Sequence, residues 1–236
     1  MRDPTLNLPS SQLPLEPESQ DFRASMHWRV FRIMAELLEG WQFLADFPNN
    51  VAVFGSATLP ENNTWYNEAR TLGQLLADAG FTVITGGGPG ILQATNQGAH
   101  EATAPNKGDS VGFNIKLSHF IRTNPYVDKH VAFHYFFVRD LMISYSARAY
   151  IYFPGGLGTL HHLTSILTLL QTKKIVSVPI ILIGTEFWQP LLTWINDNVY
   201  EQFKTIDKED TELYHLVDSA QTALELVKQA PERTEL

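Results

Sequence analysis

The 236-residue sequence contains no cysteine. This absence excludes disulfides, thiolate metal sites and cysteine nucleophiles, and it is consistent with a reducing cytoplasm. Long apolar runs are missing as well: the longest, residues 178–183, is interrupted by Pro179 and is far shorter than the roughly 20 residues of a membrane-spanning helix. The N-terminus also lacks the cationic start and apolar stretch of a signal peptide. We therefore expect a cytoplasmic protein that has no membrane partner.

Basic residues are scarce, with 17 Lys and Arg against 25 Asp and Glu, a net charge of −8. A protein that binds duplex nucleic acid needs a basic face, so we expect no nucleic acid polymer as a partner. Small anions are not excluded, because a few backbone N–H groups can hold a phosphate whatever the net charge. Hydrophobic residues make up 44% of the chain and charged residues 18%, a composition that excludes a disordered chain.

Continuous apolar runs alternate with segments of helical periodicity along most of the chain. The runs predict strands over residues 51–54, 81–85, 111–117, 149–153, 178–183 and 213–217, with 131–137 a short strand or the start of a helix. The periodic segments predict helices over residues 21–47, 65–79, 91–102, 138–147, 187–200, a stretch ending at 172 and a last one ending near 230. Strands of this kind are typical of a parallel sheet covered by helices on both faces.

We therefore predict a single doubly wound α/β domain over residues 21–236, which begins with a helical extension. Residues 1–20 contain four of the thirteen prolines, at positions 4, 9, 14 and 17, and we expect them to form an extended arm.

Glycine follows three of the predicted strands, each time where a helix begins. In open parallel sheets the ligand crevice lies beyond the carboxyl ends of the strands, and N–H groups at a helix start can face an anion. One such turn is most simply a tight turn, but three in one sheet favour a phosphate site. The candidate phosphate-binding residues are Gly55, Ser56, Gly86, Gly87, Gly88, Gly90, Gly155, Gly156, Gly158 and Thr159. The Thr159 hydroxyl can either cap the following helix or donate to a phosphate oxygen.

Two familiar phosphate motifs are absent. A dinucleotide fingerprint G-x-G-x-x-G would need glycine at positions 91 or 161, which are Ile91 and His161. A Walker loop would need Gly-Lys followed by Ser or Thr, and no such tripeptide occurs. We therefore expect neither NAD nor an ATPase of the Walker type, and no bound cofactor.

Four motifs within residues 51–199 carry a family resemblance: F-G-S, T-G-G-G-P-G, H-Y-F-F-V-R and P-G-G-L-G-T. With them the chain resembles the Lonely Guy (LOG) family of cytokinin-activating nucleoside 5′-monophosphate phosphoribohydrolases, long mislabelled as lysine decarboxylases. The resemblance implies a Rossmann-like fold, usually a homodimer, and hydrolysis of the bond between the base and ribose 5-phosphate. It implies a nucleoside monophosphate such as AMP as the ligand, and it places Arg139 in the site.

The chain departs from the family pattern at the residues that supply a carboxylate. The family motif P-G-G-x-G-T-x-x-E has His162 at the glutamate position, and the family's Arg-Lys pair is Arg139-Asp140. A glutamate common in the loop after the third strand is also missing, since Phe120 and Arg122 stand there. The half of the signature that holds phosphate is therefore intact, and the half that faces the ribose is altered.

The changes at 140 and 162 are opposite in sign, so we predict that Asp140 and His162 pair across the site. Arg139, Asp140 and His162 are the candidate catalytic residues. Independent drift in an inactive site is the other interpretation, so an active hydrolase and a binding protein without turnover both remain open. A pyridoxal-phosphate decarboxylase is excluded, because that chemistry needs a lysine in the site and none of the eight lysines lies in the glycine turns.

We expect no metal site. His161 and His162 are adjacent on a helix and point about 100° apart, which predicts that they cannot both face one metal. His130 and His134 have helical metal spacing but lack a third ligand, so packed or surface histidines are the simpler interpretation. The aromatic residues between 133 and 137 predict core or a homodimer interface.

Overall fold

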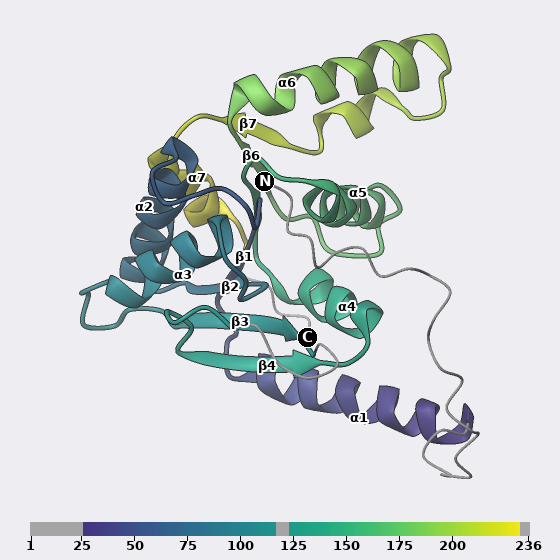
Figure 1. The fold of residues 1–236 in the computed structure, drawn as a ribbon. Helices are drawn as coiled ribbons and strands as arrows, with labels where there is room; N and C mark the ends of the chain where they lie inside the picture. The colour runs from purple at the N-terminus through teal and green to yellow at the C-terminus, as the bar shows by residue number, and fades with distance from the viewer. Residues whose placement is uncertain (1–25, 117–122, 232–236) are drawn as a thin grey trace, which may run out of the picture.

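The computed structural model describes residues 26–116 and 123–231. The expected arm, Phe120 and Arg122 lie outside the described residues. One seven-stranded sheet, parallel throughout, has the order β4-β3-β2-β1-β5-β6-β7 (Figure 1). The strands are β1 Asn50–Phe54, β2 Thr82–Thr85, β3 Ser110–Ile115, β4 Lys129–Phe133, β5 Tyr150–Tyr152, β6 Ile180–Ile183 and β7 His215–Val217. The doubly wound α/β prediction is confirmed.

Helices cover both faces of the sheet, as Figure 1 shows. α2, α3 and α7 lie on one face, and α1, α4 and α5 on the other. Their bounds are α1 Met26–Ala45, α2 Thr64–Asp78, α3 Ile91–Glu101, α4 Phe136–Ser146, α5 Leu157–Gln171, α6 Thr185–Trp194 and α7 Ala220–Gln229. None of the helices in the described residues has both the length and the apolar character needed to cross a membrane.

Two hydrophobic cores result from the alternation of side chains along buried strands. In β1, Val51 and Val53 belong to the core under α2, α3 and α7, whereas Ala52 and Phe54 belong to the core under α1, α4 and α5. All five residues of β1 are buried, which explains why this strand appears in the sequence as an uninterrupted apolar run.

Two segments differ in detail from the sequence-based prediction. The ambiguous residues 131–137 divide into the end of β4 and the start of α4. The helix predicted over 187–200 is α6, which contains Pro190, followed by a π-helix over Ile195–Gln202. A 3₁₀ helix over Lys208–Glu212 then leads into β7.

The order of the strands reverses between β1 and β5, which pair directly through Val53 and Ile151. In open α/β sheets the crevice outside the carboxyl ends of two such strands is the usual ligand site. Gly55 follows β1 and Gly155 follows β5 at this point, so the fold brings together two of the three glycine turns.

Candidate phosphate-binding pocket

A pocket of about 350 Å³ lies at the reversal of strand order. It is lined by Phe54, Gly55, Ser56, Ala57, Thr58, Gly86, Leu92, Phe136, Arg139, Gly156, Gly158, Thr159 and His162. All three glycine turns contribute to this lining, as the sequence predicts. Gly87, Gly88, Gly90 and Gly155 are candidates that do not line it.

Gly90 supports the pocket from behind. Its φ is 69°, in the left-handed region, and a Cβ at this position would collide with the carbonyl oxygen of Ser56. That same oxygen accepts a hydrogen bond from the N–H of Ile91, at 2.9 Å. The absence of a side chain at Gly90 therefore lets the end of β1 approach the start of α3.

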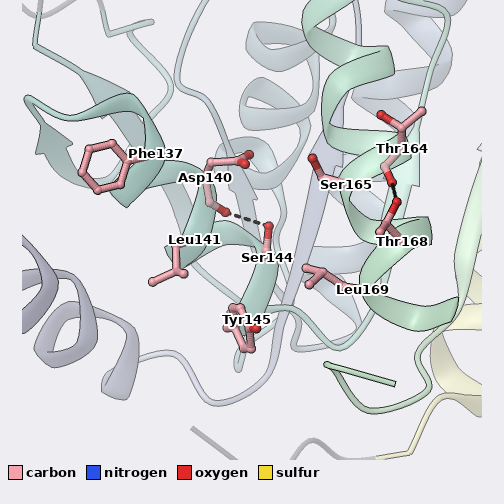
Figure 2. A pocket seen from close by; sticks show the side chains of 9 residues that line it. All are labelled: Phe137, Asp140, Leu141, Ser144, Tyr145, Thr164, Ser165, Thr168 and Leu169. Carbon is pink, nitrogen blue, oxygen red and sulfur yellow. Dashed lines mark hydrogen bonds between the residues drawn. The ribbon is translucent and has the colours of Figure 1, made fainter. Parts of the chain in front are cut away.

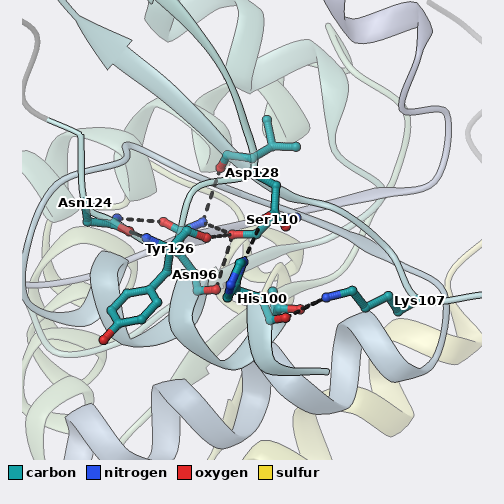
Figure 3. Close-up of polar contacts among 9 residues, drawn as sticks. Asn96, His100, Lys107, Ser110, Asn124, Tyr126 and Asp128 are labelled. Atoms are coloured by element: carbon teal, nitrogen blue, oxygen red, sulfur yellow. Dashed lines mark hydrogen bonds and ion pairs between the residues drawn. The ribbon is translucent and has the colours of Figure 1, made fainter. Parts of the chain in front are cut away.

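A buried polar network holds the turn after β2 in place, and Figure 3 shows two of its members, Asn96 and Asn124. The side-chain amide of Asn124 donates to the Gly88 carbonyl and to Oδ1 of Asn96, both at 3.0 Å. The Asn96 oxygen also accepts from the hydroxyl of Thr85 at 2.6 Å, and Thr85 in turn accepts the N–H of Gly87 at 2.9 Å. These supporting residues cannot be recognised in the sequence, because nothing in their spacing of 11 and 28 residues marks them as partners.

The turn after β5 leaves the start of α5 open. A Cβ at Gly155 would collide with the Thr159 side chain, whereas one at Gly156 or Gly158 would meet nothing within 4 Å. The N-cap residue of α5 is Gly156, which makes no side-chain cap hydrogen bond. The Thr159 N–H is bound within the turn, to Gly156 O at 3.0 Å. The positive end of α5 therefore faces the pocket without a competing side chain.

Arg139 supplies the cation of the pocket. Its Nε donates to the carbonyl of Phe113 at 2.7 Å, and its Nη2 lies 2.5 Å from where a Cβ at Gly86 would stand. Glycine at position 86 thus makes room for the guanidinium. Burial lowers the pKa of Arg139 to about 10, partly offset by the charge of Asp140. The side chain therefore stays protonated at neutral pH.

A carboxylate from α1 holds the start of α4, the helix that carries Arg139. Glu36 is buried, and its two oxygens accept the backbone N–H groups of His134 at 2.9 Å and Tyr135 at 3.1 Å. These donors precede the first turn of α4, where no residue of the helix itself can serve them. This role of Glu36 cannot be recognised in the sequence, since its partners are almost 100 residues away.

Asp140 and His162 pair as predicted, with Oδ1 of Asp140 and Nδ1 of His162 2.7 Å apart. The other oxygen, Oδ2, lies 3.3 Å from Nε2 of His161. Contrary to the prediction, the two neighbouring histidines therefore do face one centre. Their side chains leave the helix in different directions, but His161 reaches the carboxylate with its distal nitrogen and His162 with its proximal one.

The environments of the pair determine their charges. Burial acts to raise the pKa of Asp140, but the contact with His162 and the charges of both histidines outweigh it, so the pKa is lowered. For His162 burial dominates and lowers the pKa, with Asp140 acting in the opposite direction and Arg139 adding to the lowering. At neutral pH the pair is therefore a carboxylate beside a neutral imidazole.

His162 stands between this carboxylate and the pocket. Its ring packs against Phe54, with centroids 4.6 Å apart. Asp140 does not line the phosphate pocket but a second one of about 460 Å³ between α4 and α5 (Figure 2). None of the described residues that line the first pocket carries a carboxylate.

The remaining histidine candidates lie elsewhere. His130 belongs to β4 and His134 precedes α4, and both are exposed. The surface interpretation of these two residues is confirmed.

Comparison with known proteins places this geometry among related folds. The model of a family described as "Possible lysine decarboxylase" matches residues 92–227, more than half of the chain. A search of curated proteins gives no significant match. Among solved structures, the chain is similar to the molybdenum cofactor carrier protein of Chlamydomonas reinhardtii, with 22% identity, a TM-score of 0.58 and coverage of 77% of this chain and 96% of that one.

Two further structures are similar to about the same degree. A protein designated TM1055 has 21% identity and a TM-score of 0.55, over 77% of this chain and 99% of its own. The molybdenum cofactor binding protein of Rippkaea orientalis has 23% identity and a TM-score of 0.54, over 76% of this chain and 93% of its own. At such identities the likeness shows the shared fold.

Proposed function

We propose that this chain, which belongs to the LOG-type family described as possible lysine decarboxylases, binds a nucleoside 5′-monophosphate such as AMP in the pocket at the strand reversal. The observation that carries the proposal is a cation and an open helix start that face one cavity without an acidic residue. Arg139 supplies a fixed positive charge, and the first turn of α5 supplies N–H groups. Charge-assisted hydrogen bonds of this kind suit a phosphate.

The family description does not extend to the chemistry of this pocket. Pyridoxal phosphate binds its enzymes through a lysine, and none of the described residues that line the pocket is a lysine. A decarboxylase of that kind is therefore not proposed.

We further propose that the ligand is held rather than hydrolysed. Hydrolysis breaks the bond between the base and C1′, places the oxygen of water on C1′ and gives a proton to the departing base. The positive charge that develops on the ribose is stabilised by a nearby carboxylate. Here the family's glutamate position is His162, and Asp140 lies behind that ring. A molybdenum cofactor carrier shares the fold, so the fold is compatible with a binding role.

Slow hydrolysis through the exchanged pair is the second candidate. It is favoured by one observation, the 2.7 Å contact between Asp140 and His162. Because His162 lines the pocket, only its side chain separates the Asp140 carboxylate from the pocket. Incubation of the wild type with AMP, followed by measurement of free adenine and ribose 5-phosphate, separates the two. We expect binding without release of base.

A charge placed at Gly158 tests the binding site directly. Gly158 lies in the first turn of α5, and a side chain there meets open space. Gly158→Asp should leave the fold intact, because an acidic residue suits a helix start, yet it puts a negative charge where the phosphate would lie. We expect AMP affinity, measured by calorimetry, to fall at least about tenfold, equivalent to roughly 1.4 kcal/mol.

The matched control is Gly158→Asn, which has nearly the same shape and no charge. We expect it to bind AMP much more tightly than the aspartate variant. If both variants bind AMP as the wild type does, the phosphate does not lie at α5 and the proposed site is wrong.

We also propose that the protein is a homodimer. α1 and α4 pack against each other, and both leave large apolar side chains exposed. A cluster of exposed apolar side chains of this kind is typical of a surface that is buried between two subunits. These side chains are Met26, Trp28, Val30, Phe31, Met34 and Leu38 of α1 and Phe136, Phe137 and Leu141 of α4. Sedimentation of the wild type should give a dimer of the 26.6 kDa chain.

Phe31→Asp should shift the protein to monomer, whereas Trp194→Asp, at an exposed apolar residue of α6, should leave the dimer unchanged. A stable wild-type monomer at micromolar concentration would contradict the proposal.

A further inference from the structure

Asp140, His161 and His162 form a cluster to which the binding of a nucleotide assigns no function. One donor atom from each of the three side chains lies within 4.8 Å of the other two. The carboxylate comes from α4, and the two imidazoles come from neighbouring residues near the start of α5. Two imidazoles with one carboxylate form a ligand set that zinc takes in proteins.

The separations within this cluster are close to those of a coordination sphere. Nε2 of His161 lies 3.3 Å from one carboxylate oxygen and Nδ1 of His162 lies 2.7 Å from the other. In a tetrahedral zinc site with bonds of about 2.0–2.1 Å, neighbouring donor atoms lie roughly 3.3 Å apart. The separation between His161 and the carboxylate has that value, whereas the 2.7 Å separation between His162 and the carboxylate must widen as an ion enters.

The rings of the two histidines are held by aromatic neighbours. The Phe54 ring packs against His162 at 4.6 Å between centroids, and the Phe136 ring lies 5.7 Å from that of His161. Packing of this kind limits the orientations of the imidazoles before a ligand arrives. The side chain of His161 is 47% exposed, which gives an ion a path from solvent.

The charge of the cluster also suits a cation, although Arg139 beside it opposes one. Asp140 is the acidic member, and the two histidines bind metals as neutral rings. Three protein ligands leave one position of a tetrahedral ion open to water or to an anion. We propose that Asp140, His161 and His162 bind a divalent transition-metal cation, and that zinc fits this set best.

The test is equilibrium dialysis of the full chain against Zn²⁺ alone, after treatment with a chelator. We expect the wild type to bind one Zn²⁺ per chain. His161→Ala removes an exposed side chain and should not disturb folding, yet it should weaken zinc binding at least about tenfold, since loss even of a residue that only orients a ligand has that effect. Asp140→Asn should weaken it as well.

His130→Ala is the matched control, because His130 is exposed on β4, and it should bind zinc as the wild type does. Absence of zinc binding to the wild type, or equal binding by His161→Ala and the wild type, would overturn the proposal. AMP titration in metal-free buffer distinguishes a failure of the zinc proposal from a failure of the proposed nucleotide site. His161 does not line the phosphate pocket, so His161→Ala should bind AMP normally whatever the zinc result.

Discussion

The Glu36 carboxylate of α1 accepts the backbone N–H of Tyr135, the residue before α4, at 3.1 Å, together with that of His134. A side chain remote from the pocket thereby fixes the start of the helix that carries Arg139. Because Glu36 is buried, its oxygens are the local substitute for water at these two donors.

Glu36→Ala should therefore destabilise the protein. The substitution leaves two N–H groups without their partner, at a cost of about 1–3 kcal/mol in the free energy of unfolding. Urea denaturation measures this free energy. The control is Glu39→Ala on the exposed side of α1, which we expect to change stability by less than about 0.5 kcal/mol. Equal midpoints for the two variants would show that the capping contacts contribute nothing.

Gly90→Ala should destabilise the turn behind the pocket. An alanine at a φ of 69° is strained, and its Cβ would collide with the Ser56 carbonyl, so we expect a loss of about 2 kcal/mol or more. Gly88→Ala is the comparison, because its nearest neighbour, Cδ1 of Leu92, lies at an ordinary 3.5 Å. Thermal melting should give a clearly lower Tm for Gly90→Ala alone; similar Tm values would mean that the turn relaxes without cost.

Gly156→Ser should gain stability and lose affinity. Gly156 is the N-cap residue of α5 and has extended backbone angles that serine adopts freely. A serine oxygen there can accept an N–H of the first turn, which stabilises a helix by a few tenths of a kcal/mol relative to glycine. The same oxygen competes with a phosphate, so AMP should bind more weakly while the Tm rises. Gly156→Ala, which cannot cap, should not raise the Tm.

The double substitution of Asp140→Lys with His162→Glu tests whether turnover can be restored. It returns both positions to the residues of the family pattern, so base release from AMP should rise by roughly 10²-fold or more over the wild type if the rest of the site is preserved. Chromatography of free adenine measures the rate. An active wild type whose rate the double variant does not exceed would show that the exchanged pair is itself catalytic.

The fold follows from the sequence because the central strands are buried on both sides and because glycine marks the turns after β1, β2 and β5. Val51 to Phe54 and Ile180 to Ile183 are continuous apolar runs, and these bury every residue. The pairing of Asp140 with His162 follows from the family resemblance, since the two departures from the family pattern are opposite in sign.

Contacts between distant residues do not follow from local patterns. Glu36 and Tyr135 form a hydrogen bond although they are 99 residues apart in the sequence, and Asn124 and Asn96 do so at a separation of 28 residues. No local periodicity in the sequence predicts either contact. The prediction that His161 and His162 cannot face one centre is wrong for another reason. A helical wheel gives the direction of the Cβ atoms, but an imidazole has two nitrogens at different distances from the backbone, and α4 supplies a carboxylate between them.

The central position of β1 has a consequence for the synthesis of the chain. β1 pairs with β2 on one side but must wait for β5, about 100 residues later, on the other. A nascent chain that has not reached Tyr150 therefore exposes an unpaired edge of a strand that is fully buried in the finished domain, the kind of edge that promotes aggregation. The pocket does not exist at that stage, because α5 forms part of its lining. A molecule bound there could stabilise the domain only after α5 has been made.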